Sequence, residues 1–207
     1  MAVHQRPGHQ PEETTQHTAQ CDRTQQHRPG PSHLRCHRLQ DDGEGVTGGP
    51  GVHEDAQEAN QIVLEVARSQ GVKLVTKGKS MVTEEMGLNK ALEASGIQVV
   101  ETDLGEYIIQ LAGEAPFHIV APAMHKSRQE VAELFAQKLG TATAPDAAAL
   151  TRVARQALRQ QFLQADMGIT GVNFAVAETG AIAIFTNEGN GRLCTSLPRV
   201  HLAVMGM

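Results

Sequence analysis

The sequence has 207 residues, which is long enough for one domain of ordinary size with or without a tail. A net charge of -5 and an aromatic content of 3% offer neither the basic surface nor the stacking platforms of a nucleic-acid binder, so we expect no nucleic-acid partner. No apolar run reaches the roughly 18 residues of a membrane span, no secretory signal opens the chain, and its 3 cysteines do not suggest a disulfide framework, so we expect a cytoplasmic protein.

Residues 1–52 differ in composition from everything that follows. They contain no Lys, Ile, Phe, Tyr or Asn, whereas His, Gln, Arg and Pro recur. So few large apolar groups cannot bury enough surface to offset the entropy of ordering the chain, and we predict a disordered, low-complexity tail. A natural linker and out-of-frame translation of a GC-rich gene both explain this composition. His33, Cys36 and His37 are metal-ligand types, but no second ligand pair follows at zinc-finger spacing, so we predict no metal site.

From residue 53 onward the apolar residues become periodic, which predicts a folded domain over residues 53–207. Helical spacings and short β-branched runs alternate along its first half. The predicted elements are a helix from Asp55 to Gln70, a strand at Leu74 and Val75, a helix capped by Ser80 and ending near Gly96, a strand from Ile97 to Val100, a helical turn from Glu106 to Leu111, and a strand from Phe117 to Ala121. A capping box at Ser127 and Glu130 then precedes a helix, and a long helix is predicted from Asp146 to Ala165.

The last part of the chain has a different pattern. Strand-like runs at Ile169, Phe174 to Ala177, Ala181 to Phe185 and Val200 to Val204 are separated by Gly, Asn and Pro. We therefore predict hairpins that extend a sheet whose earlier strands are parallel. The fold class that follows is α/β, as a three-layer domain with a mixed sheet.

Loops beyond the carboxyl ends of the strands are the places where open α/β sheets bind ligands. After the first predicted strand, Lys77, Lys79 and Ser80 lie at a helix N-terminus, which favours an anion. This loop lacks the glycine spacing of a phosphate-binding P-loop, and a solvated turn with a capping serine explains the same residues. After the next strand, Asp103 and Glu106 offer carboxylates either for acid–base chemistry or for ordinary helix capping.

Residues 168–180 and 186–192 form the richest candidate region, because glycines that allow a close backbone approach are dense there. The candidate ligand-binding residues of this region are Asn173, Thr179, Asn187, Asn190 and Arg192. Glu178 is the candidate catalytic residue, because it follows apolar strand residues where a charge is costly unless it is partnered. We predict that these groups meet the Lys77 to Ser80 loop in one pocket for a small anionic ligand, a carboxylate or a phosphate.

The same stretches carry a resemblance to a known family. Residues 77–85, 102–111, 171–180 and 186–192 resemble, in this order, phrases of the LUD domain of the lactate utilization protein B family. The resemblance runs from about His53 to the end of the sequence. It implies a fold similar to that of sugar-phosphate isomerases and coenzyme A transferases, which agrees with the mixed three-layer sheet predicted from the residues.

The resemblance also implies a function. Family members act with two partner proteins in the bacterial oxidation of L-lactate to pyruvate, so it implies an electron-transfer or scaffold subunit with partner subunits. Full-length members are expected to carry [4Fe–4S] clusters in a later, cysteine-rich segment. This sequence has no run of four closely spaced cysteines, so we expect a domain truncated before that segment and no cofactor in this chain. Two alternatives remain: a stand-alone enzyme on a transferase-like or isomerase-like fold with Glu178 as nucleophile or base, and a structural fragment that docks partner subunits.

Overall fold

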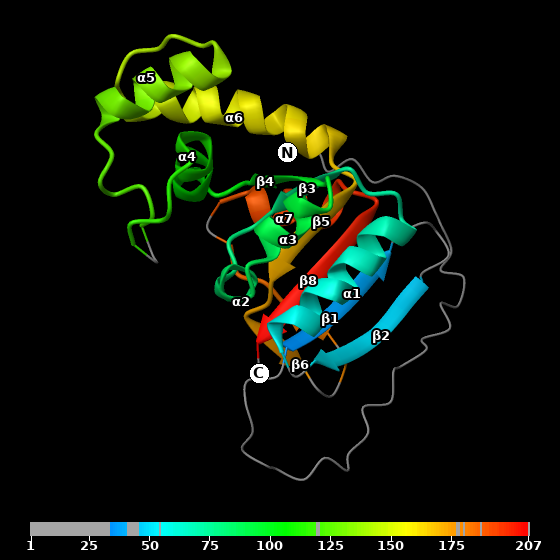
Figure 1. Cartoon of the computed structure of the whole chain (residues 1–207). Helices are drawn as coiled ribbons and strands as arrows, with labels where there is room; N and C mark the ends of the chain where they lie inside the picture. The colour runs from blue at the N-terminus through cyan, green and yellow to red at the C-terminus, as the bar shows by residue number, and fades with distance from the viewer. Residues whose placement is uncertain are drawn as a thin grey trace, which may run out of the picture.

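A six-stranded mixed sheet forms the centre of the protein, as the computed structural model in Figure 1 shows. The structure describes residues 34–40, 46–53, 55–118, 121–176, 179, 181–186 and 188–206. The strands of this sheet are β1 (Leu34–Gln40), β2 (Val46–His53), β3 (Leu74–Lys77), β4 (Gln98–Glu101), β5 (Met167–Gly171) and β8 (Val200–Gly206). Their order across the sheet is β2-β1-β8-β5-β3-β4. β8, β5, β3 and β4 are parallel, whereas β1 is antiparallel to both of its neighbours.

Helices cover both faces of the sheet, so the predicted three-layer α/β fold is confirmed. The helices are α1 (Ala56–Ser69), α2 (Met81–Glu85), α3 (Leu88–Ala94), α4 (Leu104–Ala112), α5 (Arg128–Leu139), α6 (Ala147–Gln164) and α7 (Asn190–Ser196). In Figure 1, α1 runs across one face of the sheet, and α5 and α6 lie side by side beyond the edge strand β4.

Two hydrophobic clusters lie on opposite faces of the sheet. One joins α1 and α3 to the strands, and the other joins α4, α5, α6 and α7 to the opposite face. Side chains of successive residues in a strand point to opposite faces of the sheet. In β4, Val99 therefore belongs to the first cluster and Val100 to the second. The sheet is therefore buried on both sides, as a parallel sheet requires.

Local capping signals explain where several helices begin. The Asp55 carboxylate accepts the Glu58 N–H at 2.7 Å, and the predicted capping box pairs Ser127 with Glu130 in both directions. Ser80 caps α2 as predicted, but the single helix expected from there to Gly96 is two helices. The break falls at Gly87, whose φ of 66° lies in the left-handed region that glycine adopts without strain.

The strand expected from Phe117 to Ala121 is wrong for the residues that the structure describes. Phe117 and His118 form a bend, Ala121 is irregular, and residues 119 and 120 lie outside the described part. The Phe117 N–H donates to the carbonyl oxygen of Pro122 at 3.1 Å, so the segment turns back on itself. Prolines at 116 and 122 flank it, and proline cannot donate to a sheet ladder.

The last strands also differ from the expected hairpins that extend the sheet. β6 (Phe174–Val176) and β7 (Ala181–Ala183) pair only with each other and form a separate two-stranded sheet. The chain then forms α7 and crosses back, so that β8 is parallel to β5. Gly168 of β5 permits this crossover, because a Cβ there would lie 1.8 Å from the carbonyl oxygen of Cys194 in α7.

The structure describes two strands within the stretch of residues 34–53. The backbones of residues 34–40 and 46–53 form β1 and β2, and β1 pairs with β8 along seven residues. Backbone hydrogen bonds to an open sheet edge do not require apolar side chains, which is why composition did not reveal these strands. The rest of the predicted tail lies outside the described residues, and the domain boundary near residue 53 stays a prediction.

Candidate functional site

The loop after β3 is held tightly against the end of β5. The Gly78 N–H donates to the Ile169 carbonyl at 2.9 Å, and the Ser80 hydroxyl accepts the Thr83 N–H at 3.3 Å as the cap of α2. A Cβ on Gly171 would lie 3.1 Å from the Ser80 side chain, so the close approach of these two segments depends on glycine. Ser80 therefore serves the predicted capping role and lies where two strand ends meet.

Lys77 is buried beneath this loop rather than exposed in it. Its ammonium lies 2.9 Å from Glu101 and donates to the Thr83 hydroxyl at 3.2 Å, and its side chain is 0% exposed. Glu101 also accepts from the Asn89 amide at 2.6 Å. The structure thus places Lys77 in a buried ion pair, and its predicted contact with a ligand stays a prediction.

Lys79 connects the loop after β3 to the loop after β4. Its backbone N–H donates to the Asp103 carboxylate at 2.7 Å, and its ammonium lies 2.6 Å from Glu106. Asp103 precedes α4 but makes no side-chain cap, because its carboxylate accepts from Lys79 instead. Two of the loops singled out by the sequence therefore meet at the carboxyl ends of adjacent parallel strands, as expected for this fold class.

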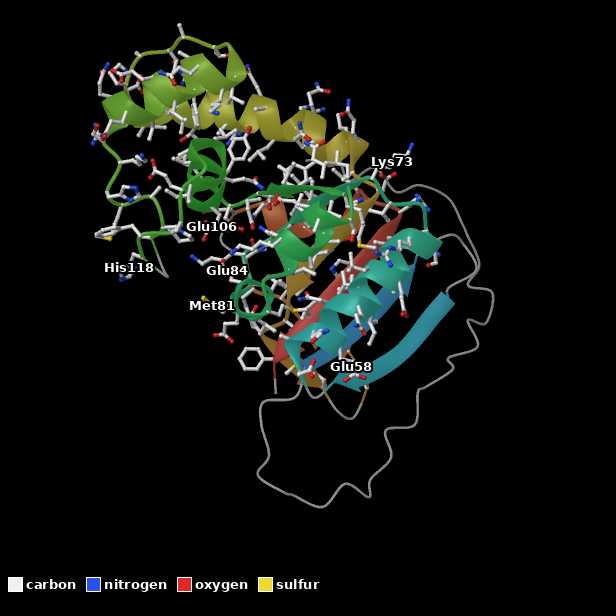
Figure 2. The ribbon with its side chains drawn as sticks, in the orientation of Figure 1. Glu58, Lys73, Met81, Glu84, Glu106 and His118 are labelled. Carbon is white, nitrogen blue, oxygen red and sulfur yellow. The ribbon has the colours of Figure 1, made fainter. Side chains whose placement is uncertain are left out.

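A cluster of carboxylates surrounds these lysines. Figure 2 shows Glu84 of α2 and Glu106 of α4 projecting toward the same region. Burial raises the pKa of Glu84, Lys77 opposes the rise, and the negative charges of Glu101 and Glu106 add to it. The lysines are therefore largely compensated by carboxylates of the protein itself.

The segment after β5 brings two predicted asparagines to the same end of the sheet. The Asn173 side chain accepts the Phe185 N–H at 2.8 Å, which fixes the base of the β6–β7 hairpin. Asn190 begins α7, donates to the Thr102 hydroxyl at 3.4 Å and accepts from the Thr186 hydroxyl at 3.3 Å. The Gly189 to Gly191 stretch forms the start of this helix.

A cavity of about 460 Å³ opens where these loops converge. Of the predicted site residues, those that line it are Lys79, Ser80, Asp103, Asn173 and Asn190. Sequence reasoning missed other polar residues of the lining, namely Thr170, Thr186 and Glu188. All three lie in or beside the glycine-rich stretches, but nothing in the sequence shows which side of a strand or turn they occupy. Size and mixed polar and apolar walls fit a site for a small molecule.

The other predicted residues that the structure describes do not line this cavity. Glu106 reaches the cavity only through Lys79, and Thr179 and Arg192 are exposed and do not line it. The Thr179 hydroxyl accepts the Ala181 N–H at 3.3 Å in the hairpin turn. Glu178 and Asn187 lie outside the described residues, so the catalytic role predicted for Glu178 stays a prediction.

The lining described here has more negative than positive charges. Lys79 is opposed by Asp103 and Glu188, and burial raises the pKa of Glu188, with Asp103 and Glu106 adding to the rise. An anion that enters this cavity must therefore compete with Glu106 for Lys79. The rest of the polar lining consists of uncharged hydroxyl and amide groups, which can both donate and accept hydrogen bonds.

Thr170, which lines the cavity, forms a buried pair with His201. The Thr170 hydroxyl lies 2.8 Å from Nε2 of His201, and both residues are buried. Burial lowers the pKa of His201 to about 4 from its usual 6.5, so this imidazole is neutral near pH about 7.

Whether the chain binds a metal stays a prediction. No group of three or more His, Cys, Asp or Glu side chains in the described part of the chain is placed to hold a metal ion. Cys194 is fully buried with its sulfur 3.6 Å from the Thr102 hydroxyl, and burial raises the pKa of its thiol to about 11.

Among the described residues, no helix is both long and apolar enough to cross a membrane, and the cytoplasmic location stays a prediction.

The fold is a three-layer α/β domain with a cavity at the carboxyl ends of its parallel strands. Residues 51–207 match the LUD domain, and the chain belongs to this family. It is 49% identical over 172 residues to lactate utilization protein B of Shouchella clausii, which covers 83% of this chain and 36% of that protein. No solved structure matches it.

Two further relatives are similar to this chain over a comparable stretch. Lactate utilization protein B of Exiguobacterium sp. is 55% identical over 154 residues, which is 74% of this chain and 33% of that protein. The uncharacterized electron transport protein YkgF of Escherichia coli is 50% identical over 151 residues, which is 73% of this chain and 32% of that protein. The chain therefore spans about a third of the length of the curated relatives that it matches.

Proposed function

We propose that this chain serves bacterial L-lactate utilization, the oxidation of L-lactate to pyruvate, as a scaffold or electron-transfer subunit together with partner subunits. The observation that carries the proposal is the identity of about half of the aligned residues to proteins named lactate utilization protein B. A relative named as an electron transport protein supports the electron-transfer part. Such identity along nearly the whole domain favours a shared role over a shared fold alone.

Iron–sulfur clusters do not fit the residues of this chain that the structure describes. Cys194 is buried, its thiol pKa is raised, and a [4Fe–4S] cluster usually takes four thiolates whereas the chain has 3 cysteines. In the proposal, clusters belong to the longer family members, and this domain contributes its fold and its cavity.

The cavity beside Lys79 and Asn190 is proposed to take a small organic anion, such as L-lactate or pyruvate. Lys79 offers a charge-assisted hydrogen bond to a carboxylate once it separates from Glu106. Asp103 and Glu188 can accept a hydrogen bond from the hydroxyl of a hydroxy acid. Together they would distinguish L-lactate from an anion that has no hydroxyl to donate.

Calorimetric titration of L-lactate, pyruvate and phosphate into the full chain tests this proposal. We expect Lys79→Ala to weaken L-lactate binding by about 1–3 kcal/mol, the scale of a charge-assisted hydrogen bond. Lys138→Ala is the matched control, because Lys138 is an exposed lysine in the last turn of α5. Arg192→Ala distinguishes the sequence-based prediction, in which it binds the ligand, from the structure, in which it does not line the cavity.

The outcome that refutes the proposed ligand class is specific. If none of the three anions gives a saturable heat, or if every variant binds them as the wild type does, the cavity is not a site for a small organic anion.

A further inference from the structure

A second cavity, of about 800 Å³, lies between α6, α7 and the start of α4. Its walls are mainly apolar side chains from all three helices, namely Leu104, Ala154, Leu158, Phe162, Leu193 and Leu197. Leu163 also lines it and is 58% exposed, and Leu197 is 46% exposed. Leaving such side chains in water forgoes the free energy that their burial would contribute. An apolar group in this cavity would bury these side chains.

Two arginines stand at the edge of this apolar wall. Arg155 and Arg159 are one helical turn apart on α6, on the same stripe as Phe162, and both line the cavity. Among the residues that the structure describes, no carboxylate lies within ion-pair distance of either guanidinium. Arginine stems pack on apolar surface while their heads remain available, so the cavity combines an apolar wall with two uncompensated positive charges.

The only acidic residue in the described lining is Glu188, which begins the turn before α7. Glu188 and Asn190 also line the first cavity, so the two cavities meet at the start of α7. A negative group is repelled at the Glu188 end and attracted at the α6 end. This polarity sets the direction in which an amphiphilic anion would lie.

We propose that the second cavity binds an amphiphilic carboxylate, with its alkyl chain between α6 and α7 and its head group at Arg155 and Arg159. A planar guanidinium matches a carboxylate in geometry, and the pair supplies the charge that the head group needs. The alkyl chain covers the exposed leucines of the groove. This site adjoins the proposed lactate site at Glu188 and Asn190, but the proposal does not depend on lactate binding.

Titration of the full chain with hexanoate, octanoate and decanoate by calorimetry tests the alkyl part of the proposal. Each added pair of methylene groups should tighten binding by about tenfold, because each buried methylene contributes a similar increment. Decanol, which has the same chain as decanoate and no charge, should bind about tenfold more weakly than decanoate.

Variants of α6 test the head group. The double substitution Arg155→Gln and Arg159→Gln should weaken decanoate binding by about tenfold or more and leave decanol binding unchanged. Arg152→Gln is the matched control, because Arg152 is an exposed arginine of the same helix that does not line the cavity, and it should bind decanoate as the wild type does. Equal circular dichroism spectra of all variants would verify that the helix is intact.

Three results would overturn the proposal. One is equal affinity of the wild type for decanoate and decanol, which would indicate a groove for an uncharged occupant such as an apolar helix of a partner. Another is an equal effect of the double substitution and of Arg152→Gln. The last is an affinity that does not change with chain length, which would mean that the alkyl chain stays outside the cavity.

Discussion

The buried His201 should make the stability of the protein depend on pH in a defined window. Burial lowers its pKa to about 4 in the folded state, against 6.5 for the exposed group. Between pH 6.5 and about 4, the His201 imidazole is protonated in the unfolded chain but neutral in the folded chain. Protonation therefore favours the unfolded chain, and the stability that is present above pH 6.5 is lost as the pH falls toward about 4. At about 1.4 kcal/mol for each pH unit, the loss amounts to about 3 kcal/mol.

Urea denaturation of the wild type and of His201→Gln between pH about 7 and about 4 measures this loss. Glutamine does not titrate and can keep a hydrogen bond to Thr170, so the variant should lose about 3 kcal/mol less than the wild type across the window. His118→Gln is the control, because His118 is exposed, and it should follow the wild type. Parallel losses in the wild type and His201→Gln would refute the reasoning.

Three further predictions concern the core beneath the cavity. Gly168→Ala should lower the free energy of unfolding by about 1–3 kcal/mol or more in urea, because its Cβ would overlap the Cys194 carbonyl oxygen; wild-type stability would contradict this. Lys77→Met should lower the free energy of unfolding by about 3–5 kcal/mol, because it leaves the Glu101 carboxylate buried without its ion-pair partner. Adding Glu101→Leu should restore most of that stability, and a double variant as unstable as Lys77→Met would contradict this prediction. Burial raises the pKa of the Cys194 thiol to about 11, so Cys194 should react with a thiol reagent far more slowly in the folded protein than in guanidinium. Mass spectrometry of the peptide that contains Cys194 would measure both rates, and equal rates would contradict this prediction.

Helices with strong local signals were predictable from the sequence. The caps at Asp55 and Ser127 depend on residues three positions apart, and the long helix α6 shows apolar residues at helical spacing over eighteen residues. Such signals do not require knowledge of what the helix packs against.

Features that depend on distant residues were not predictable in the same way. Lys77 is buried because the parallel register of β3 and β4 places it opposite Glu101. The start of α7 is rich in Gly and Asn, a composition that turns and helix starts share. The strand β1 pairs with β8, which lies at the other end of the sequence, and β2 in turn pairs with β1.

The candidate site was also predictable in part. That the loops after β3 and β5 converge follows from the topology of parallel strands, so Lys79 and Asn173 were predicted in one pocket, whereas Asp103 was predicted only as a candidate in a separate loop. Their charge balance was not predicted, because the partnership of Lys79 with Glu106 is a tertiary contact. Thr170 was missed because its place beside His201 depends on the pairing of β5 with β8.

Growth on L-lactate tests the central claim, that this domain serves lactate utilization through the cavity beside Lys79. A Shouchella clausii strain that lacks its own lactate utilization protein B would receive that protein with residues 51–207 of this chain in place of the matching segment. The account predicts that this chimera restores growth on L-lactate, that Lys79→Ala within it abolishes or slows that growth, and that Lys138→Ala does not. A stably produced chimera that fails on L-lactate, or equal growth of the Lys79→Ala and Lys138→Ala chimeras, would contradict the account.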